Sequence, residues 1–178
     1  RPSTAWVLHR LDRLRPADAV VVEEAPSARP TMQQQLPMRA AGSFYTMCSG
    51  GLGYSLPAAV GVALGRPGQR VIALIGDGSA MYAIQALWSA AQLQLPITFI
   101  ILKNRRYAAL QEFAPTFGFH EGDKLEGTDL PELDFLANTN AGGAATEVSG
   151  TGPASDPVFA FTSSPSLPQD EVLSDRKS

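Results

Sequence analysis

The chain has 178 residues, of which 44% are hydrophobic and 17% charged, and its formal net charge is −3 at pH 7. These values are typical of one globular domain with its own core, and they argue against nucleic-acid and membrane partners. No apolar run approaches the roughly 20 residues that span a bilayer, and a lone cysteine, Cys48, excludes a disulfide framework. We therefore expect a cytoplasmic protein, and a start without Met suggests a fragment.

The first third of the chain predicts a helix, a strand and a second helix. Apolar residues recur at helical spacing from Trp6 to Leu14, with Ser3 or Thr4 as the cap. A short buried strand is expected at residues 19–22, followed by Glu23 and Glu24, and a polar helix at residues 31–37. Paired acids can serve acid–base chemistry, but solvated charges at a strand end are the more common explanation.

A glycine-rich segment, Gly50-Gly51-Leu52-Gly53, precedes an uncharged apolar stretch at residues 56–64. The stretch predicts a helix that is buried all round. Glycines before such a helix can simply permit close packing, and a Gly-x-Gly string alone is weak support for a nucleotide site.

The centre of the chain predicts a β-α-β unit. Residues 71–75 and 97–102 are continuous apolar runs, which suit strands buried on both faces of a parallel sheet. Between them a single helix is expected before Pro96, from the spacing of Met81, Ile84, Leu87, Trp88 and Ala91. A right-handed crossover brings both strands to the same carboxyl edge of the sheet.

Polar residues follow both of these strands. Asp77 comes after the first and Asn104 after the second, so two hard oxygen ligands suited to Mg²⁺ or Ca²⁺ are expected on one edge. Gly76 and Gly78 allow a close backbone approach, and Ser79 stands where a helix with free N–H groups begins. The pattern indicates a magnesium-bridged diphosphate. The alternative is that Gly-Asp-Gly-Ser is only a strand-to-helix turn with an N-cap.

The spacing of Gly76-Asp77-Gly78 and Asn104, which follows 27 residues after Asp77, resembles the thiamine-diphosphate signature. The likeness extends through YTMCSGGLGYSLPAAVGVAL before it and NRRYAALQEF after it. The chain resembles the C-terminal, diphosphate-binding domain of thiamine-diphosphate-dependent 2-oxoacid decarboxylases of the benzoylformate decarboxylase group. This resemblance implies an α/β fold with a central, mainly parallel sheet flanked by helices.

The resemblance also implies roles for particular residues. Mg²⁺ would be held by Asp77, Asn104 and the backbone oxygen of Arg106, while the Gly50 carbonyl would accept from the cofactor's aminopyrimidine and Leu52 would wedge under the bent cofactor. The full set of implied cofactor-binding residues is Ser27, Gly50, Gly51, Leu52, Gly76, Gly78, Ser79 and Tyr107. The implied substrate pocket is lined by Ala109, Leu110 and Phe113, for which a place in the core is the open alternative.

Beyond Leu136 the resemblance thins. Residues 117–134 predict a loop, in which His120 and Asp123 are expected to be solvated rather than to bind a metal. Strands are expected at residues 144–149 and 157–161, but the seven residues between them are too few for the helix that the family carries there. We expect a thiamine-diphosphate domain at residues 1–162, truncated at its C-terminus, and a disordered tail at residues 163–178.

The expected function is anchoring of thiamine diphosphate through Mg²⁺ in a decarboxylase, a lyase that acts on a small 2-oxoacid as a homo-oligomer. The family's activating glutamate and substrate histidines lie in other domains, so no catalytic residue is expected in this chain and the chain alone should be inactive. The alternative is a truncated, non-catalytic remnant or oligomerisation module that no longer binds the cofactor tightly. A Rossmann dinucleotide binder is disfavoured, because that fold requires G-x-G-x-x-G and an acid where this chain has GDGS and Asn104.

Overall fold

The computed structural model describes residues 3–120, 122–131, 133, 135, 144–148 and 158–162. Among these residues, six strands form one sheet in the order β2-β1-β3-β4-β6-β5. The first four pair in parallel, and β6 and β5 are antiparallel additions beside β4. The strands are β1 (Val20–Glu24), β2 (Phe44–Thr46), β3 (Val71–Gly76), β4 (Ile97–Leu102), β5 (Ala144–Val148) and β6 (Val158–Thr162).

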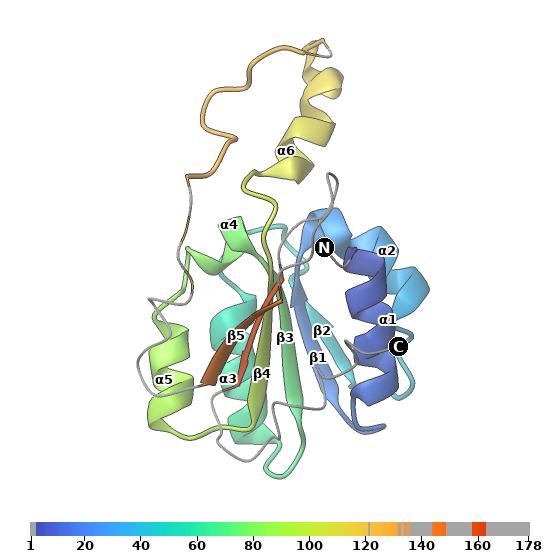
Figure 1. Cartoon of the computed structure of the whole chain (residues 1–178), viewed down its shortest axis with the longest axis vertical. Helices are drawn as coiled ribbons and strands as arrows, with labels where there is room; N and C mark the ends of the chain where they lie inside the picture. The colour runs from blue at the N-terminus through green and yellow to red at the C-terminus, as the bar shows by residue number, and fades with distance from the viewer. Residues whose placement is uncertain are drawn as a thin grey trace.

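Helices cover both faces of this sheet (Figure 1). In Figure 1, α1 and α2 lie on the side of β1 and β2, whereas α3 and α5 cover the opposite face. The structure confirms the predicted α/β fold with a central, mainly parallel sheet. The helices are α1 (Thr4–Leu14), η1 (Pro26–Ala28), α2 (Arg29–Gln35), α3 (Ser55–Gly65), α4 (Asp77–Ala80), α5 (Ala86–Gln92), α6 (Ala108–Phe113) and η2 (Ala114–Phe117).

The continuous apolar strands are explained by two separate cores. Along β3, Val71, Ala73 and Ile75 pack with α3 and α5, while Ile72 and Leu74 pack with α1 and α2. Successive side chains of a strand point to opposite faces, so a strand covered on both faces needs apolar residues at every position. This arrangement buries all of β3 except its last residue, Gly76.

Local signals place several elements as predicted. Ser3 caps α1, because its Oγ accepts a hydrogen bond from the backbone N–H of Trp6 at 3.2 Å. The structure also confirms the short helix after Tyr107 and two strands near the C-terminus. The predicted disordered tail, residues 163–178, lies outside the described residues, as does the connection between β5 and β6.

The prediction of one helix between β3 and β4 was wrong. The chain forms α4 and α5 there, separated by tight turns in which the N–H groups of Tyr82 and Ala83 bond to carbonyls three residues earlier. These turns shift the apolar residues away from a common face. Leu87 is buried, but Met81 is 40% exposed and Trp88 59% exposed.

The apolar helix α3 is buried on one side only, which also differs from the prediction. Leu56, Ala59 and Ala63 face the core, whereas Leu64 is 56% exposed. No helix in the described part of the chain combines the length and apolar composition that crossing a bilayer requires.

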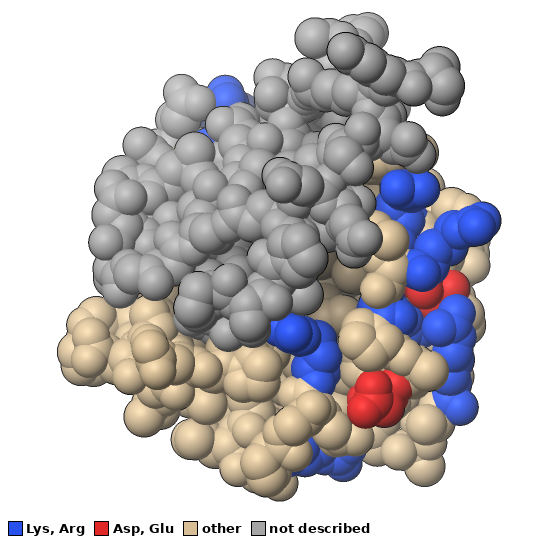
Figure 2. Space-filling view, turned by 60° about the horizontal axis from the view of Figure 1, so that its bottom comes forward, with Lys and Arg blue, Asp and Glu red and all other residues tan. Residues whose placement is uncertain are grey.

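Charged groups are distributed unevenly between surface and interior. The face in Figure 2 shows more Lys and Arg than Asp and Glu among the described residues. Three acids, Glu23, Glu24 and Asp77, are at most 2% exposed. All three lie at the ends of parallel strands, and Lys103, which follows β4, is 4% exposed, so the carboxyl edge of the sheet holds buried charges of both signs.

Truncation of the core side chain Phe99 should destabilise the domain strongly. Phe99 is 1% exposed and lies on β4 within the core under α3 and α5. Phe99→Ala should lower the free energy of unfolding by about 3–5 kcal/mol, because it removes buried apolar surface and leaves a cavity. Urea denaturation measures the change. Trp88→Ala, at a 59% exposed position, should change it by less than about 0.5 kcal/mol, and equal losses would contradict the described core.

Candidate functional site

The carboxyl ends of β3 and β4 lie side by side. Gly76 pairs with Leu102 as the last residues of the two strands, and Asp77 and Lys103 follow them. The Asp77 Oδ2 accepts a hydrogen bond from the backbone N–H of Arg105 at 2.8 Å. The prediction that Asp77 and Asn104 leave the sheet at one edge is therefore confirmed.

The Asp77 carboxylate is buried and held by backbone N–H groups. It is 2% exposed, and its Oδ1 accepts from the N–H of Gly78 at 3.0 Å. Burial raises the pKa of Asp77 above 3.8, and hydrogen bonds from Arg105, Gly78 and Asn104 oppose this rise. Among the described residues, no Lys or Arg side chain forms an ion pair with Asp77. A buried carboxylate in this state fits a divalent cation.

Asn104 connects the segment after β4 to η1, which follows β1. Its Nδ2 donates to the Oγ of Ser27 at 3.5 Å, and its Oδ1 accepts from the N–H of Arg106 at 3.2 Å. Arg105, which lies between Asn104 and Arg106, has a backbone φ of +58, a left-handed conformation that residues other than Gly and Asn seldom adopt. This turn brings Ser27, Asp77, Asn104 and Arg106 to one edge of the sheet.

Gly78 makes room for a side chain of this chain. A Cβ at Gly78 would lie 2.5 Å from Cε1 of Tyr107 and 3.2 Å from Cδ1 of Leu130. At Gly76, φ is −73, and a Cβ would meet nothing closer than 3.7 Å. Within the chain itself, a side chain at Gly78 would collide with the Tyr107 ring, whereas one at Gly76 would meet no close protein atom. The expectation that both glycines open the backbone to a ligand stays a prediction.

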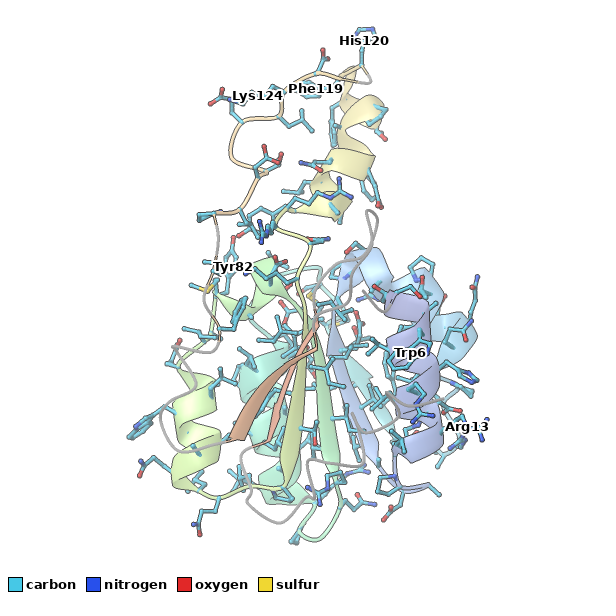
Figure 3. All side chains as sticks on the ribbon, in the orientation of Figure 1. Trp6, Arg13, Tyr82, Phe119, His120 and Lys124 are labelled. Carbon is cyan, nitrogen blue, oxygen red and sulfur yellow. The ribbon has the colours of Figure 1, made fainter. Side chains whose placement is uncertain are left out.

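Tyr107 also contacts Tyr82, and Tyr82 lies beside Gly53, which belongs to the glycine-rich segment before α3. Burial, the hydrogen bond with Tyr82 and the charge of Asp77 raise the pKa of Tyr107 above 10.0. A Cβ at Gly53 would lie 3.0 Å from the Cβ of Tyr82, and Figure 3 shows Tyr82 at the end of the sheet nearest α6. The glycine loop, defined here as residues 50–53, therefore lies at the same edge as Asp77.

Glu24 holds the glycine loop in place. Its Oε1 accepts from the N–H of Gly53 and its Oε2 from the N–H of Ser55, each at 2.6 Å. These bonds join the end of β1 to the start of α3 across 29 and 31 residues. Sequence analysis missed this role, although two acids at the end of a buried strand were a visible signal.

Glu23 and Glu24 are both 0% exposed, so the expectation of solvated charges was wrong. Glu23 accepts from the N–H of Ala25 at 2.6 Å, from Arg29 Nη2 at 2.9 Å and from Thr46 Oγ1 at 2.8 Å. Burial is possible because each carboxylate is matched by several donors. The two acids connect β1 to different neighbours. Glu23 bonds to residues of α2 and β2, and Glu24 bonds to the first residue of α3.

The exposed part of the glycine loop leaves space for a ligand. Gly50 has φ +73, and a Cβ there would meet no atom within 4 Å. Close packing therefore does not explain Gly50, although it explains Gly53. Gly51 is also exposed, and Leu52 is half-buried.

Helix α6 projects beyond the carboxyl edge of the sheet (Figure 1). Leu110 is 59% exposed and Phe113 64% exposed, while Ala109 is half-buried. The alternative that these residues belong to the core is therefore wrong for Leu110 and Phe113. Whether they line a substrate pocket remains a prediction.

The loop after α6 lies far from the sheet, with His120 at its tip (Figure 3). The His120 side chain is 90% exposed, and its Nδ1 lies 3.8 Å from the Oδ2 of Asp123. Among the described residues, no group of three His, Cys, Asp or Glu side chains could hold a metal ion. The 90% exposure of the His120 side chain and the 46% exposure of that of Asp123 agree with the expectation that these two residues are solvated.

Comparison with known proteins identifies the family of the chain. Residues 27–156 match the family model of the thiamine pyrophosphate enzyme C-terminal TPP binding domain. The chain belongs to the thiamine pyrophosphate enzymes. Thiamine pyrophosphate is thiamine diphosphate, so this membership confirms the family resemblance noted in the sequence.

Two curated members of the family illustrate the range of relatives. Benzoylformate decarboxylase of Pseudomonas aeruginosa is 49% identical over 137 residues, which cover 77% of this chain and 25% of that enzyme. The acetolactate synthase isozyme 2 large subunit of Escherichia coli is 30% identical over 133 residues, covering 74% and 24%. The chain thus spans about a quarter of the length of these thiamine pyrophosphate enzymes.

Solved structures of the family share the fold. The thiamine diphosphate-dependent 4-hydroxybenzoylformate decarboxylase of Rhodococcus jostii RHA1 superposes with a TM-score of 0.72 at 42% identity, covering 77% of this chain and 25% of that one. Benzoylformate decarboxylase from Polynucleobacter necessarius gives a TM-score of 0.72 at 37% identity, covering 79% and 26%.

Ionisation of Asp77 should make the metal-free domain less stable as pH rises. Because the folded pKa is raised above 3.8, the stability that this group contributes is fully present below 3.8 and is lost as pH rises through the folded pKa. Asp77→Asn should remove this part of the pH dependence. Urea unfolding at several pH values with a chelator present measures it. Asp123→Asn, which changes an exposed carboxylate, serves as the control for the substitution itself, and an unchanged profile in Asp77→Asn would contradict the assignment.

Proposed function

We propose that this chain anchors thiamine diphosphate through Mg²⁺ as part of a 2-oxoacid decarboxylase of the benzoylformate type. The observation that carries the proposal is the buried Asp77 carboxylate, without an ion-pair partner among the described residues, next to Asn104 at the carboxyl edge of the sheet. The 49% identity to a benzoylformate decarboxylase supports the reaction class.

The donor set at this edge fits a hard divalent cation. Asp77 offers a carboxylate, Asn104 an amide oxygen and Arg106 a backbone carbonyl, which are ligands for Mg²⁺ and, less selectively, for Ca²⁺. Binding of the cation would offset the cost of burying the Asp77 charge, which the raised pKa reflects. In this proposal Ser27, Gly76, Gly78 and Ser79 lie around the diphosphate, and Tyr107 packs beside it.

The glycine loop would hold the other end of the cofactor. The open side of Gly50, together with Gly51 and Leu52, provides exposed backbone and an apolar side chain at the same edge. When bound, thiamine diphosphate supplies a nucleophilic carbon and a ring that accepts the electrons left by CO₂. The residues of this chain bind and orient the cofactor, and none is proposed to act as a catalytic acid or base.

The substrate and the assembly are part of the same proposal. Leu110 and Phe113 expose apolar surface beyond the edge that holds Asp77, and Ala109 precedes them on α6. We assign this surface to the pocket for a small 2-oxoacid with an aryl or branched group, in an enzyme assembled from several copies of its chain.

Removal of the Asp77 carboxylate should abolish cofactor binding without unfolding the domain. Asp77→Ala removes a ligand and the charge that offsets the cation, whereas Asn104→Ala removes only a neutral ligand. With Mg²⁺ present, calorimetry should therefore detect no thiamine diphosphate binding by Asp77→Ala and weakened binding by Asn104→Ala. Asp123→Ala serves as a control at an exposed carboxylate. A wild-type chain that binds no cofactor would favour the alternative of a non-catalytic module.

The isolated chain should release no measurable CO₂ from benzoylformate. General acid–base catalysis contributes about 10²–10⁴-fold, and in this proposal the groups that supply it lie outside this chain. Assays with thiamine diphosphate and Mg²⁺ test this expectation. CO₂ release that depends on the cofactor and disappears in Asp77→Ala would contradict it and assign catalysis to this domain.

A further inference from the structure

We infer that Glu24 is a positioning residue for the cofactor's ring end, acting through the glycine loop rather than by contact. The inference rests on the proposed function, in which the glycine loop receives the thiamine part and Asp77 the diphosphate part. Glu24 belongs to neither set of ligands. Its carboxylate determines where the loop lies relative to the sheet.

The geometry of this contact is specific. The Glu24 carboxylate accepts hydrogen bonds from two backbone N–H groups, one on either side of Tyr54. These are the N–H of Gly53, at the end of the loop, and the N–H of Ser55, at the start of α3, both at 2.6 Å. Charge-assisted bonds of this length are about twice as strong as neutral ones. The partial positive charge at the start of the 11-residue helix α3 adds to the attraction.

Little else in the described part of the chain fixes the first half of the glycine loop. Gly50 and Gly51 are exposed, and a Cβ at Gly50 would meet no atom within 4 Å. Three of its four residues are glycines, which have the largest conformational freedom of any residue. Two fixed N–H groups at its C-terminal end therefore restrict which way the Gly50 carbonyl and the Leu52 side chain face.

Glu23 supplies a matched control on the preceding position of β1. It is also 0% exposed and also accepts a backbone N–H, but its partners are Ala25, Arg29 and Thr46 rather than the glycine loop. Substitutions at Glu23 and at Glu24 each disturb a buried carboxylate of the same strand, and only the substitution at Glu24 releases the loop.

The experiment compares two probes, thiamine diphosphate and inorganic pyrophosphate, each with Mg²⁺. Glu24→Gln places an amide NH₂ against one of the two N–H groups, and the loss of a charged hydrogen bond should raise the Kd of thiamine diphosphate about tenfold or more. The Kd of pyrophosphate, which lacks the ring end, should rise far less. Glu23→Gln should change both values by the same factor, so the ratio of the two Kd values reports positioning and not stability.

Each outcome decides between the proposals. A wild-type chain that binds thiamine diphosphate, with an unchanged ratio in Glu24→Gln, would overturn the positioning role and leave the proposed function standing. A wild-type chain that binds neither probe would overturn the proposed function and this inference with it.

Hydrogen exchange of the wild-type chain tests the contact even if Glu24→Gln does not fold. The amides of Gly53 and Ser55 should exchange slowly, because the Glu24 carboxylate accepts from both, and the amides of Gly50 and Gly51 should exchange fast. Thiamine diphosphate should slow the second pair, whereas pyrophosphate should not. Equal, fast exchange at all four amides would contradict the inference.

Discussion

Parallel pairing of β1, β3 and β4 is the constraint on which the rest of the structure depends. Their registers place Glu24 beside Ile75 and Gly76 beside Leu102, so that all three strands end at one edge of the sheet. Helices on both faces bury nearly every residue of these strands, with Gly76 and Thr98 half-buried, and this requires apolar residues at nearly every position. Polar residues can then appear only where the strands end, and there they meet.

The buried acids at this edge differ in how their charge is balanced. Glu23 has the guanidinium of Arg29 and the hydroxyl of Thr46, and Glu24 has two amides at the start of a helix. Asp77 has backbone N–H groups, and burial nevertheless raises its pKa. Desolvation of an incompletely balanced carboxylate leaves a strong preference for a cation. Asp77 is therefore the group at which a metal would gain most.

Division of labour along the edge follows from this difference. In the proposed function the ends of β3 and β4 hold the charged part of the cofactor, and the glycine loop receives its rings. Glu24 links the two regions, since it is the last residue of β1 and accepts a hydrogen bond from the Gly53 N–H of the glycine loop. In that function the chemistry of the reaction would belong to the cofactor, and the domain would contribute position, charge and a shaped surface.

The sequence by itself determined the two-face burial of the strands, a cap of the first helix at Ser3 or Thr4, α6 and the shared edge of Asp77 and Asn104. Each of these follows from local periodicity or from the handedness of one crossover. Tertiary structure alone decided that Glu24 bonds to Gly53, 29 residues away, and that Tyr107 fills the space beside Gly78. It also decided that the segment after Asp77 breaks into α4 and α5. Such contacts join residues distant in the chain, and their geometry exists only once the layers have packed.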